Sequence, residues 1–418
     1  MRAVVVGAGL GGLLTACALA ERGFRVRVHE SLPYPGGRFT NLEFRGFQLS
    51  TGALHMIPHG RRGPLAEMLA ELGAGVEIFR SEPQAVFRIG GRDYGVDEVY
   101  SAFSTGEKLR AMKLLAMMKL GRARAGEESY AEWLERHLRS ELVMRLADAF
   151  TGWCLSLRAH QVPAAEVLAQ VENLARLGET GVPDGGCRGV VEALVEVLES
   201  NGGELRLRSR VLGVSGTPWS FRVHTGEGAE EAEVVVCNAG LHRSAELAEG
   251  VLPPEYVRML RGVESVPGVK ISVACDEPVL GHSGVVFTPD AERVCGMNEV
   301  TNAVPELAPP GKHLLMAHAA PAGGDLRREA EVALRDLHRL IPDFRKRCRV
   351  LAVQTYRGEW PVNHAPSGTH IPPETPAGGL YLVGDGVKPR GWMETDGIAM
   401  GVRGMLEHLS RALEESSV

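Results

Sequence analysis

The sequence predicts an α/β fold, in which a parallel sheet forms one domain and a mixed arrangement of helices and strands forms another. A chain of 418 residues is long enough for two or three domains and a large core. Near the N-terminus a strand, a glycine-rich turn, a helix and a second strand follow one another, as in a parallel sheet. Further along, residues 269–275 and 350–356 read as strands and residues 326–340 as an amphipathic helix, which indicates the mixed domain.

The N-terminal unit changes its hydrophobic period from one segment to the next. Residues 3–6 are a β-branched run, typical of a strand buried on both faces. Residues 10–22 have the apolar spacing of a helix, and Gly23 is a common C-terminal stop. Residues 24–29 alternate apolar with charged side chains, as a second strand does.

A membrane anchor is the alternative for this stretch, because residues 3–20 are 18 consecutive residues without a charge. A spanning helix or a signal peptide would not change period at Gly7 or carry four glycines at that break. The sequence therefore favours a buried unit of a globular domain.

The glycine turn has the spacing Gly7-x-Gly9-x-x-Gly12, and Glu30 ends the second strand. Gly7 allows the tight turn, Gly9 lets a pyrophosphate approach the backbone, and Gly12 lets the helix pack closely on the sheet. The helix N-terminus offers free N–H groups to phosphates, and Glu30 can accept a hydrogen bond from a ribose 2′-hydroxyl. This pattern predicts a dinucleotide site, and a purely structural turn is the alternative. Because Glu30 would repel a 2′-phosphate, FAD and NAD are favoured over NADP.

The composition argues against several classes of protein. The 46 basic and 52 acidic residues give a net charge of −6, which argues against a nucleic-acid-binding surface. The seven cysteines form no C-x-x-C pair, which argues against a metal cage or a disulfide framework and fits a reducing cytosol. We therefore expect a cytoplasmic protein with no nucleic-acid partner and no bound metal.

A second glycine motif, Gly36-Gly37-Arg38, follows soon after Glu30. Together with the dinucleotide turn it resembles the N-terminal signature of phytoene desaturase-like and amine oxidase-like flavoproteins, whose cofactor domain is Rossmann-like. Three distant stretches, at 182–214, 232–240 and 378–409, resemble later segments of the same superfamily. The resemblance implies FAD, and non-covalent FAD in particular, because no cysteine or histidine stands in a known covalent-flavin context.

The resemblance also implies cofactor roles for particular residues. It places Arg38 near the flavin end, Val211 at the adenine, and Gly384-Asp385 at the ribityl and phosphate region. A helix beginning near Gly397 would direct its N-terminal amides at the flavin N1/O2 edge, where negative charge accumulates on reduction. The cofactor-binding residues expected in this chain are Gly7, Gly9, Gly12, Glu30, Gly37, Arg38, Val211, Gly384, Asp385, Gly397 and Ile398.

By the same resemblance the cofactor domain is discontinuous in sequence. It is expected to comprise residues 1–60, 180–240 and 376–418, and a substrate domain is expected to comprise residues 61–179, largely helical, and 241–375, rich in strands. The chain departs from the superfamily at Ser50-Thr51-Gly52, where relatives often carry an acid before the glycine.

Three residues are candidates for catalysis. His55 is placed near the flavin ring by resemblance, and a packed histidine is the alternative. Lys270 is one charge in an apolar strand; amine oxidases hold a water near flavin N5 with a comparable lysine, whereas an edge lysine pointing to solvent is the alternative. Trp392 precedes the C-terminal helix and would line the substrate side of the ring. His55 and His59 have the spacing of zinc ligands, but no third ligand is evident and we expect no metal.

Residues 107–124 form a basic stretch rich in Met and Leu. Such a helix can rest on an anionic membrane and admit a lipid. An ordinary helix of the substrate domain with a solvated basic face is the alternative. The sequence leaves the oligomeric state open.

Together these observations predict a FAD-dependent oxidoreductase that acts on a hydrophobic small molecule, isoprenoid or carotenoid-like. The expected chemistry is hydride transfer at flavin N5, in a desaturation, a saturation, or a flavin-assisted isomerisation or hydration. The alternatives are an amine oxidase or protoporphyrinogen oxidase type of flavoenzyme, and a prenyl-lipid carrier resembling Rab dissociation inhibitors.

Overall fold

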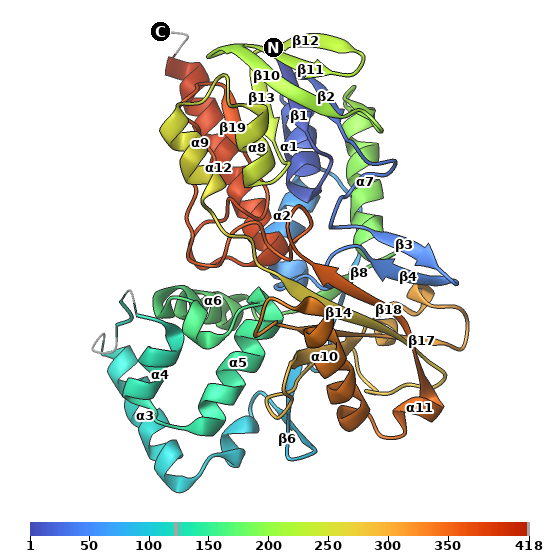
Figure 1. The fold of residues 1–418 in the computed structure, drawn as a ribbon, viewed down its shortest axis with the longest axis vertical. Coiled ribbons are helices and arrows are strands. Elements are labelled where there is room, and N and C mark those ends of the chain that lie inside the picture. Colours follow the sequence, from blue (N-terminus) through green and yellow to red (C-terminus); the bar gives the residue numbers. More distant parts are fainter. Residues whose placement is uncertain (121–123, 127, 416–418) are drawn as a thin grey trace.

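A computed structural model describes residues 1–120, 124–126 and 128–415 (Figure 1). A parallel sheet of five strands forms the centre of the upper half, in the order β19-β13-β1-β2-β9. Its strands come from widely separated stretches of the chain, which confirms the predicted discontinuous α/β fold. They are β1 (Arg2–Val6), β2 (Arg25–His29), β9 (Glu204–Arg206), β13 (Val234–Cys237) and β19 (Leu380–Leu382).

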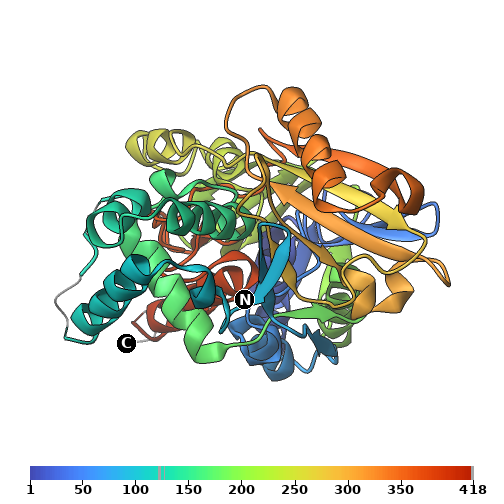
Figure 2. The ribbon, with the colours of Figure 1, turned by 90° about the horizontal axis from the view of Figure 1, so that it is seen from below.

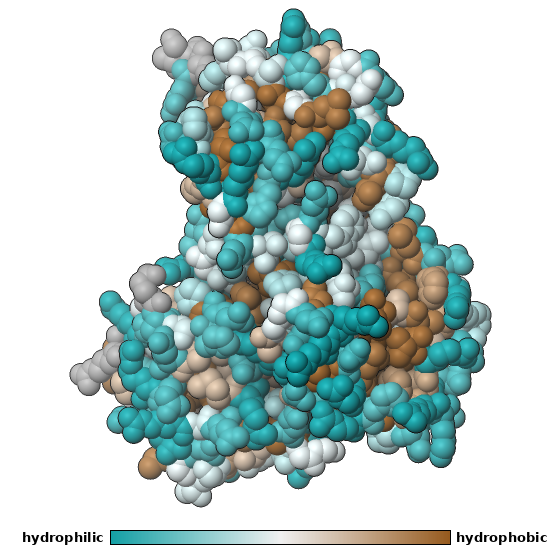
Figure 3. Space-filling view, in the orientation of Figure 1, coloured by the Kyte–Doolittle hydropathy of each residue, from teal (hydrophilic) through white to brown (hydrophobic). Residues whose placement is uncertain are grey.

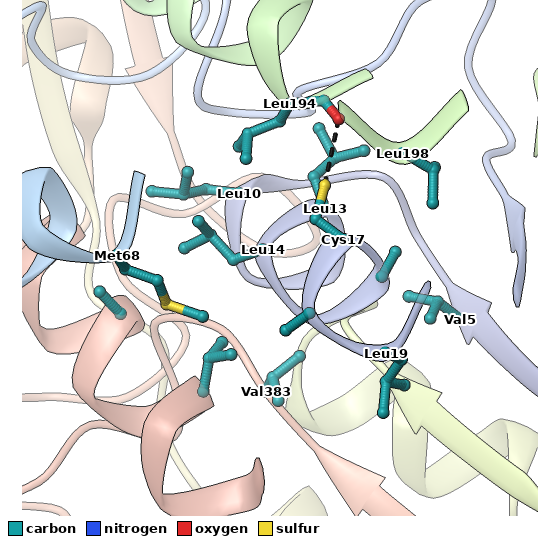
Figure 4. Close-up of a cluster of buried hydrophobic side chains, with 14 of the residues drawn as sticks. Val5, Leu10, Leu13, Leu14, Cys17, Leu19, Met68, Leu194, Leu198 and Val383 are labelled. Atoms are coloured by element: carbon teal, nitrogen blue, oxygen red, sulfur yellow. Dashed lines mark hydrogen bonds between the residues drawn. The ribbon is translucent and has the colours of Figure 1, made fainter. Parts of the chain in front are cut away.

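Three long helices pack beside this sheet: α1 (Leu10–Glu21), α7 (Cys187–Ser200) and α12 (Glu394–Glu415). Every residue of α1 from Leu10 to Ala20 is buried. Its side chains contact α7 on one side, and α12 and α2 (Pro64–Glu71) on the other, so the helix is apolar on all its faces (Figure 4). The Cys17 thiol donates a hydrogen bond to the Leu194 carbonyl at 3.1 Å. The uncharged N-terminal stretch is therefore the interior of a globular domain, as predicted.

A small antiparallel sheet and two helices complete the upper half. Val214 and Phe221 of this sheet share an apolar cluster with Leu260 and with Val235 of the parallel sheet. The elements are β10 (Val211–Thr217), β11 (Ser220–Thr225), β12 (Gly228–Ala232), α8 (Leu241–Leu247) and α9 (Pro254–Arg261).

The lower half contains a sheet of seven strands, in the order β18-β14-β17-β16-β15-β6-β7. All neighbours are antiparallel except β15 and β6. One face packs on α10 (Leu326–Leu340) and α11 (Phe344–Arg347) through apolar side chains such as Ile271 and Leu337. The strands are β6 (Ala85–Ile89), β7 (Arg92–Gly95), β14 (Gly268–Cys275), β15 (Val285–Phe287), β16 (Val294–Glu299), β17 (His313–Ala319) and β18 (Cys348–Tyr356).

Four helices lie beside this sheet in the lower half (Figures 1 and 2). Of these, α5 packs directly on β15, β16 and β17, and Trp153 of α5 lies in the same apolar cluster as Phe287. The molecule narrows between its upper and lower halves, as the space-filling view shows (Figure 3). The helices are α3 (Thr105–Lys119), α4 (Tyr130–His137), α5 (Glu141–Leu155) and α6 (Ala164–Leu177).

Two short antiparallel pairs lie near the junction of the halves, β3 (Asn41–Phe44) with β4 (Phe47–Ser50) and β5 (Ile78–Arg80) with β8 (Gly181–Pro183). The strands predicted at 269–275 and 350–356 and the helix predicted at 326–340 are all present. Among the described residues, no helix has the length and apolar character needed to cross a bilayer.

Candidate cofactor site

A cavity of about 680 Å³ lies at the carboxyl ends of the parallel strands. It reaches from Glu30 and Val211 in the upper half to Trp153 of α5 in the lower half. Its size is that of a small-molecule site, and the carboxyl edge of a parallel sheet is where such sites form. Nine of the residues predicted to bind the cofactor border it: Gly7, Gly9, Glu30, Gly37, Arg38, Val211, Gly384, Asp385 and Ile398.

The glycine turn after β1 has no room for side chains. Gly7 has a φ of +97°, a conformation that favours glycine. A Cβ on Gly9 would lie 2.5 Å from Asn238 Nδ2, and a Cβ on Gly12 would lie 2.1 Å from the Gly7 carbonyl oxygen. Gly7 and Gly9 therefore leave bare backbone facing the cavity, whereas Gly12 serves the close packing of α1 and does not border the cavity.

Glu30 is fixed at the end of β2 by the backbone around it. Its Oε2 accepts a hydrogen bond from the Ala8 amide at 2.8 Å, and its Oε1 accepts one from the Leu32 amide at 2.8 Å. The side chain is buried but borders the cavity. Since an ionised carboxylate can accept about four hydrogen bonds, Glu30 retains capacity for a hydroxyl of a ligand.

Arg38 and Asp385, predicted as separate contacts, form one ion pair in the cavity wall. The guanidinium donates to both carboxylate oxygens, at 2.7 and 3.1 Å, and also to the carbonyls of Pro361 and Val362. The carboxylate accepts a further bond from the His364 amide at 2.9 Å. Burial alone would raise the pKa of Asp385, but the charges of Arg38 and His364 outweigh it and hold the pKa well below its usual range.

The C-terminal helix begins earlier than predicted. Its first residue is Glu394, and the Gly397 amide donates at 2.9 Å to the carbonyl of Met393, the residue that precedes the helix. The prediction that α12 begins near Gly397 is therefore wrong by three residues, and Gly397 itself does not border the cavity. Glu394, Thr395 and Ile398 border it instead, so the positive end of the helix dipole is directed toward it. Burial raises the pKa of Glu394 to about 8.

Lys270 lies inside the protein. Its strand, β14, is paired on both sides, by β17 and β18, so the interpretation as an edge lysine exposed to solvent is wrong. The Nζ donates to Ser50 Oγ at 2.7 Å, to the Gly52 carbonyl at 2.8 Å and to the Ser50 carbonyl. Burial lowers the pKa of Lys270 to about 7. Gly52 borders the cavity and Lys270 does not, so the lysine supports the cavity wall from behind.

His55 and Trp392 also lie outside the cavity lining. His55 is fully buried, with Nε2 3.0 Å from the Gln48 carbonyl, and burial together with the charge of Lys270 lowers the pKa of His55 to about 3. Trp392 packs its ring edge-on to His59, with ring centroids 5.7 Å apart. His59 Nδ1 lies 2.6 Å from Asp396 Oδ2. Among the described residues, no group of three His, Cys, Asp or Glu side chains is placed to hold a metal.

Several residues of the cavity wall are not predicted by the sequence motifs. Asn238, in the turn after β13, lies against both Gly9 and Gly384. Arg210 and Arg243 also border the cavity, and the Arg243 guanidinium donates to the Val211 carbonyl at 3.2 Å. Asn238 lies in the segment 232–240, which resembles the superfamily, so that segment could have identified Asn238 as a residue of the site. No motif marks the two arginines.

The comparisons with known proteins agree with this geometry. The family model for flavin-containing amine oxidoreductases matches residues 10–395. The chain belongs to the flavin-containing amine oxidoreductase family. The predicted resemblance is thereby confirmed, and the protein is a flavin-dependent oxidoreductase.

Two known proteins are similar along nearly the whole chain. The crystal structure of an oxidoreductase from Methanosarcina mazei is 41% identical, with a TM-score of 0.93, and the match covers 97% of this chain and 100% of that one. An uncharacterised protein from Methanocaldococcus jannaschii is 39% identical over 98% of this chain and 100% of its own. A phytoene desaturase from Cercospora nicotianae is 27% identical over 62% of this chain, and the match spans about half, 48%, of that protein.

The buried Lys270 predicts a specific dependence of stability on pH. Its pKa is about 7 in the folded protein against 10.5 for an ordinary lysine, so between these values only the unfolded chain holds the proton. The free energy of unfolding should therefore rise with pH across that range, by up to roughly 1.4 kcal/mol per pH unit from this group. Below about pH 7 both states are protonated and the contribution is constant.

Denaturant unfolding of the wild type and of Lys270→Met at several pH values in this range measures the effect. The variant should lose the rise with pH. Lys312→Met, at a half-exposed lysine paired with Asp276, is the matched control and should keep it. Parallel curves for the wild type and Lys270→Met would contradict a depressed pKa of Lys270.

Proposed function

We propose that the protein binds FAD without a covalent bond and uses it to oxidise or reduce a hydrophobic substrate, isoprenoid or carotenoid-like. The observation that carries the proposal is the convergence of three features on one cavity: the bare Gly7–Gly9 backbone, the anchored Glu30 and the N-terminus of α12. Each of these suits a different part of one long dinucleotide.

The residues present fit FAD from end to end. Glu30 would accept a hydrogen bond from the adenosine ribose, and the first amides of α1 would bind the pyrophosphate. Val211, at the start of β10, would contact the adenine. The first amides of α12 would lie at the flavin end, where they stabilise negative charge. The predicted boundaries between the cofactor and substrate domains stay a prediction.

A non-covalent cofactor is supported by the state of the cavity thiol. Cys154 of α5 borders the cavity, and burial raises its pKa well above that of an ordinary thiol. A thiol that stays protonated is a poor nucleophile, so Cys154 is unsuited to form a bond to the flavin.

A hydrophobic substrate is supported by the lower end of the cavity and by the relatives. When bound, a flavin accepts or donates a hydride at N5, and the surrounding protein orients the substrate and excludes water. Leu54, Met56 and Trp153 supply apolar surface there, and Trp360 adds an aromatic ring. The carotenoid desaturase relatives act on substrates of this kind, although their identity with this chain is low.

A second candidate is an amine oxidase or protoporphyrinogen oxidase type of reaction, on a substrate that carries polar groups. Ser272 and Asn298 both lie beside Met316 in the register of the seven-stranded sheet, on the face that carries Lys270. Ser272 Oγ and both side-chain polar atoms of Asn298 are buried and have no hydrogen-bond partner among the residues that the structure describes. Buried polar atoms of this kind favour an ordered water or a polar ligand group nearby.

We further propose that α3 contacts an anionic membrane, from which a hydrophobic substrate would be drawn. Leu109, Met112 and Leu115 follow one another at helical spacing with 69%, 61% and 57% of their surface exposed. Lys113 and Lys119 are exposed on the same helix. Apolar side chains flanked by lysines are complementary to an anionic lipid surface. Arg122 belongs to the predicted basic stretch but lies outside the described residues.

The cofactor proposal is tested on the purified protein. It should be yellow or become so with added FAD, and denaturation should release about one FAD per chain, since no bond holds it. Glu30→Ala should raise the Kd for FAD roughly tenfold or more, because a hydrogen bond to a charged group is lost. Glu43→Ala, at an exposed carboxylate of β3, is the control and should leave the Kd unchanged. A protein that stays colourless would favour the prenyl-lipid carrier, and an unchanged Kd in Glu30→Ala would mean that the ribose contact is misassigned.

The substrate class is tested by reduction of the bound flavin without oxygen. Carotenoid or isoprenoid compounds in detergent should bleach its visible absorption if the protein oxidises them, or restore the absorption of flavin reduced beforehand if the protein reduces them, and simple amines should do neither. Leu54→Gln, in the cavity wall, should lower kcat/KM for such substrates roughly tenfold, because an apolar contact is replaced by a polar one. Leu42→Gln, at an exposed leucine of β3, should have no effect. Bleaching by amines alone would reject the isoprenoid proposal in favour of the second candidate.

The membrane proposal is tested by flotation with lipid vesicles. Protein should bind vesicles rich in phosphatidylserine and not vesicles of phosphatidylcholine alone. Replacing Leu109, Met112 and Leu115 by Ser should lower binding several-fold. The same change at Val171 and Leu212, exposed apolar residues elsewhere, should not. Equal binding to both vesicle types, or no binding to either, would contradict the proposal and favour an ordinary helix with a solvated basic face.

A further inference from the structure

Two thiols face each other at one end of the seven-stranded sheet. Cys275 is the last residue of β14 and Cys348 the first residue of β18, and the two are directly opposite in the antiparallel register. Their sulfur atoms are 3.1 Å apart. Neither thiol belongs to the cofactor cavity.

The backbone is already spaced for a covalent bond between them. Opposite residues of an antiparallel pair have Cα atoms about 4.5–5.5 Å apart. This range lies inside the Cα separations of about 4.4–6.8 Å that disulfides span. A disulfide here therefore requires movement of the two side chains and little of the strands.

The two cysteines differ in access and acidity, as a reacting pair requires. Cys275 is buried, whereas Cys348 is partly exposed and is flanked in sequence by Arg347 and Arg349. The hydrogen bond from Cys275 and the charge of Arg347 lower the pKa of Cys348, and the same bond together with burial raises that of Cys275. Cys348 is therefore the thiol that ionises first and meets a reagent first.

We propose that Cys275 and Cys348 form a redox pair that closes to a disulfide on exchange with a small-molecule disulfide. The Cys348 thiolate attacks one sulfur of the reagent and expels the other half as a thiolate, which leaves a mixed disulfide on Cys348. Cys275 then loses its proton and attacks the Cys348 sulfur, which expels the second half of the reagent. Two protein thiols are oxidised, and one external disulfide is reduced to two thiols.

The bond would close a long loop that contains much of the lower half. The enclosed residues 276–347 include β15, β16, β17 and α10. The bond also ties the outer strand β18 to β14, and the Tyr356 hydroxyl at the far end of β18 donates to the Gly52 carbonyl in the cavity wall at 2.7 Å. A cross-link across a long loop restricts the unfolded chain, so oxidation should raise Tm.

Oxidised glutathione with the full-length protein, followed by peptide mass spectrometry, tests the pair. The linked Cys275–Cys348 peptide should appear, the count of free thiols should fall from seven to five, and Tm should rise by roughly 3 °C. Cys275→Ser should instead trap glutathione on Cys348, because the resolving thiol is gone. Cys17→Ser, at a buried thiol of α1, should cross-link as the wild type does.

Two outcomes would overturn the proposal. One is that the wild type keeps glutathione on Cys348 without ever forming the linked peptide. The other is that all seven thiols stay reduced under conditions that modify an exposed thiol of a control protein. Because these readouts do not involve the flavin, they are independent of the proposed function.

Discussion

The turns that follow β1, β13 and β19 pack so tightly that the cofactor cavity can form only where these turns carry glycine, which has no side chain. A Cβ on Gly384 would lie 2.8 Å from Asn238 Oδ1, and one on Gly9 would lie 2.5 Å from Asn238 Nδ2. Parallel strands bring their carboxyl ends to one edge, so three turns from distant parts of the chain lie in the same small volume there. Glycine lacks the Cβ atom that would clash at these positions, so the backbone itself forms the wall of the site.

The ion pair between Arg38 and Asp385 then connects this edge of the sheet to the rest of the molecule. Arg38 follows the second strand, Asp385 follows the last, and the carbonyls of Pro361 and Val362 come from the connection between the two sheets. A paired carboxylate and guanidinium with these further hydrogen bonds tolerate the low exposure of the site, whereas either charge alone would be costly there. The arrangement fixes the cavity wall before any ligand binds, which reduces the ordering that binding would require.

Lys270 shows that the sequence pattern of a strand does not determine whether a polar side chain in it is buried or exposed. One lysine among apolar residues is compatible with an edge strand or with a buried polar contact, and the local sequence is the same in both cases. The choice depends on β17 and β18, whose residues lie 38 or more positions further along the chain. Once both neighbours are in place the ammonium group has no solvent, and the carbonyls of Ser50 and Gly52 replace it. The cost of burying the charge appears as the lowered pKa.

The N-terminal strand, turn, helix and strand were predictable within about one residue, because hydrophobic period and glycine spacing are local properties of a chain. The same holds for the amphipathic helix at 326–340 and for Glu30 at the end of its strand. The distant stretches around Val211 and Gly384 were assigned by resemblance, and the fold brings both to the cavity.

Only the tertiary structure decided the remaining features. It pairs Arg38 with Asp385 and places Lys270 in the interior. It also begins α12 at Glu394 and brings Cys275 opposite Cys348. Each of these depends on which strands become neighbours and in what register. That choice is made by the burial of whole sheet faces and not by any short stretch of residues.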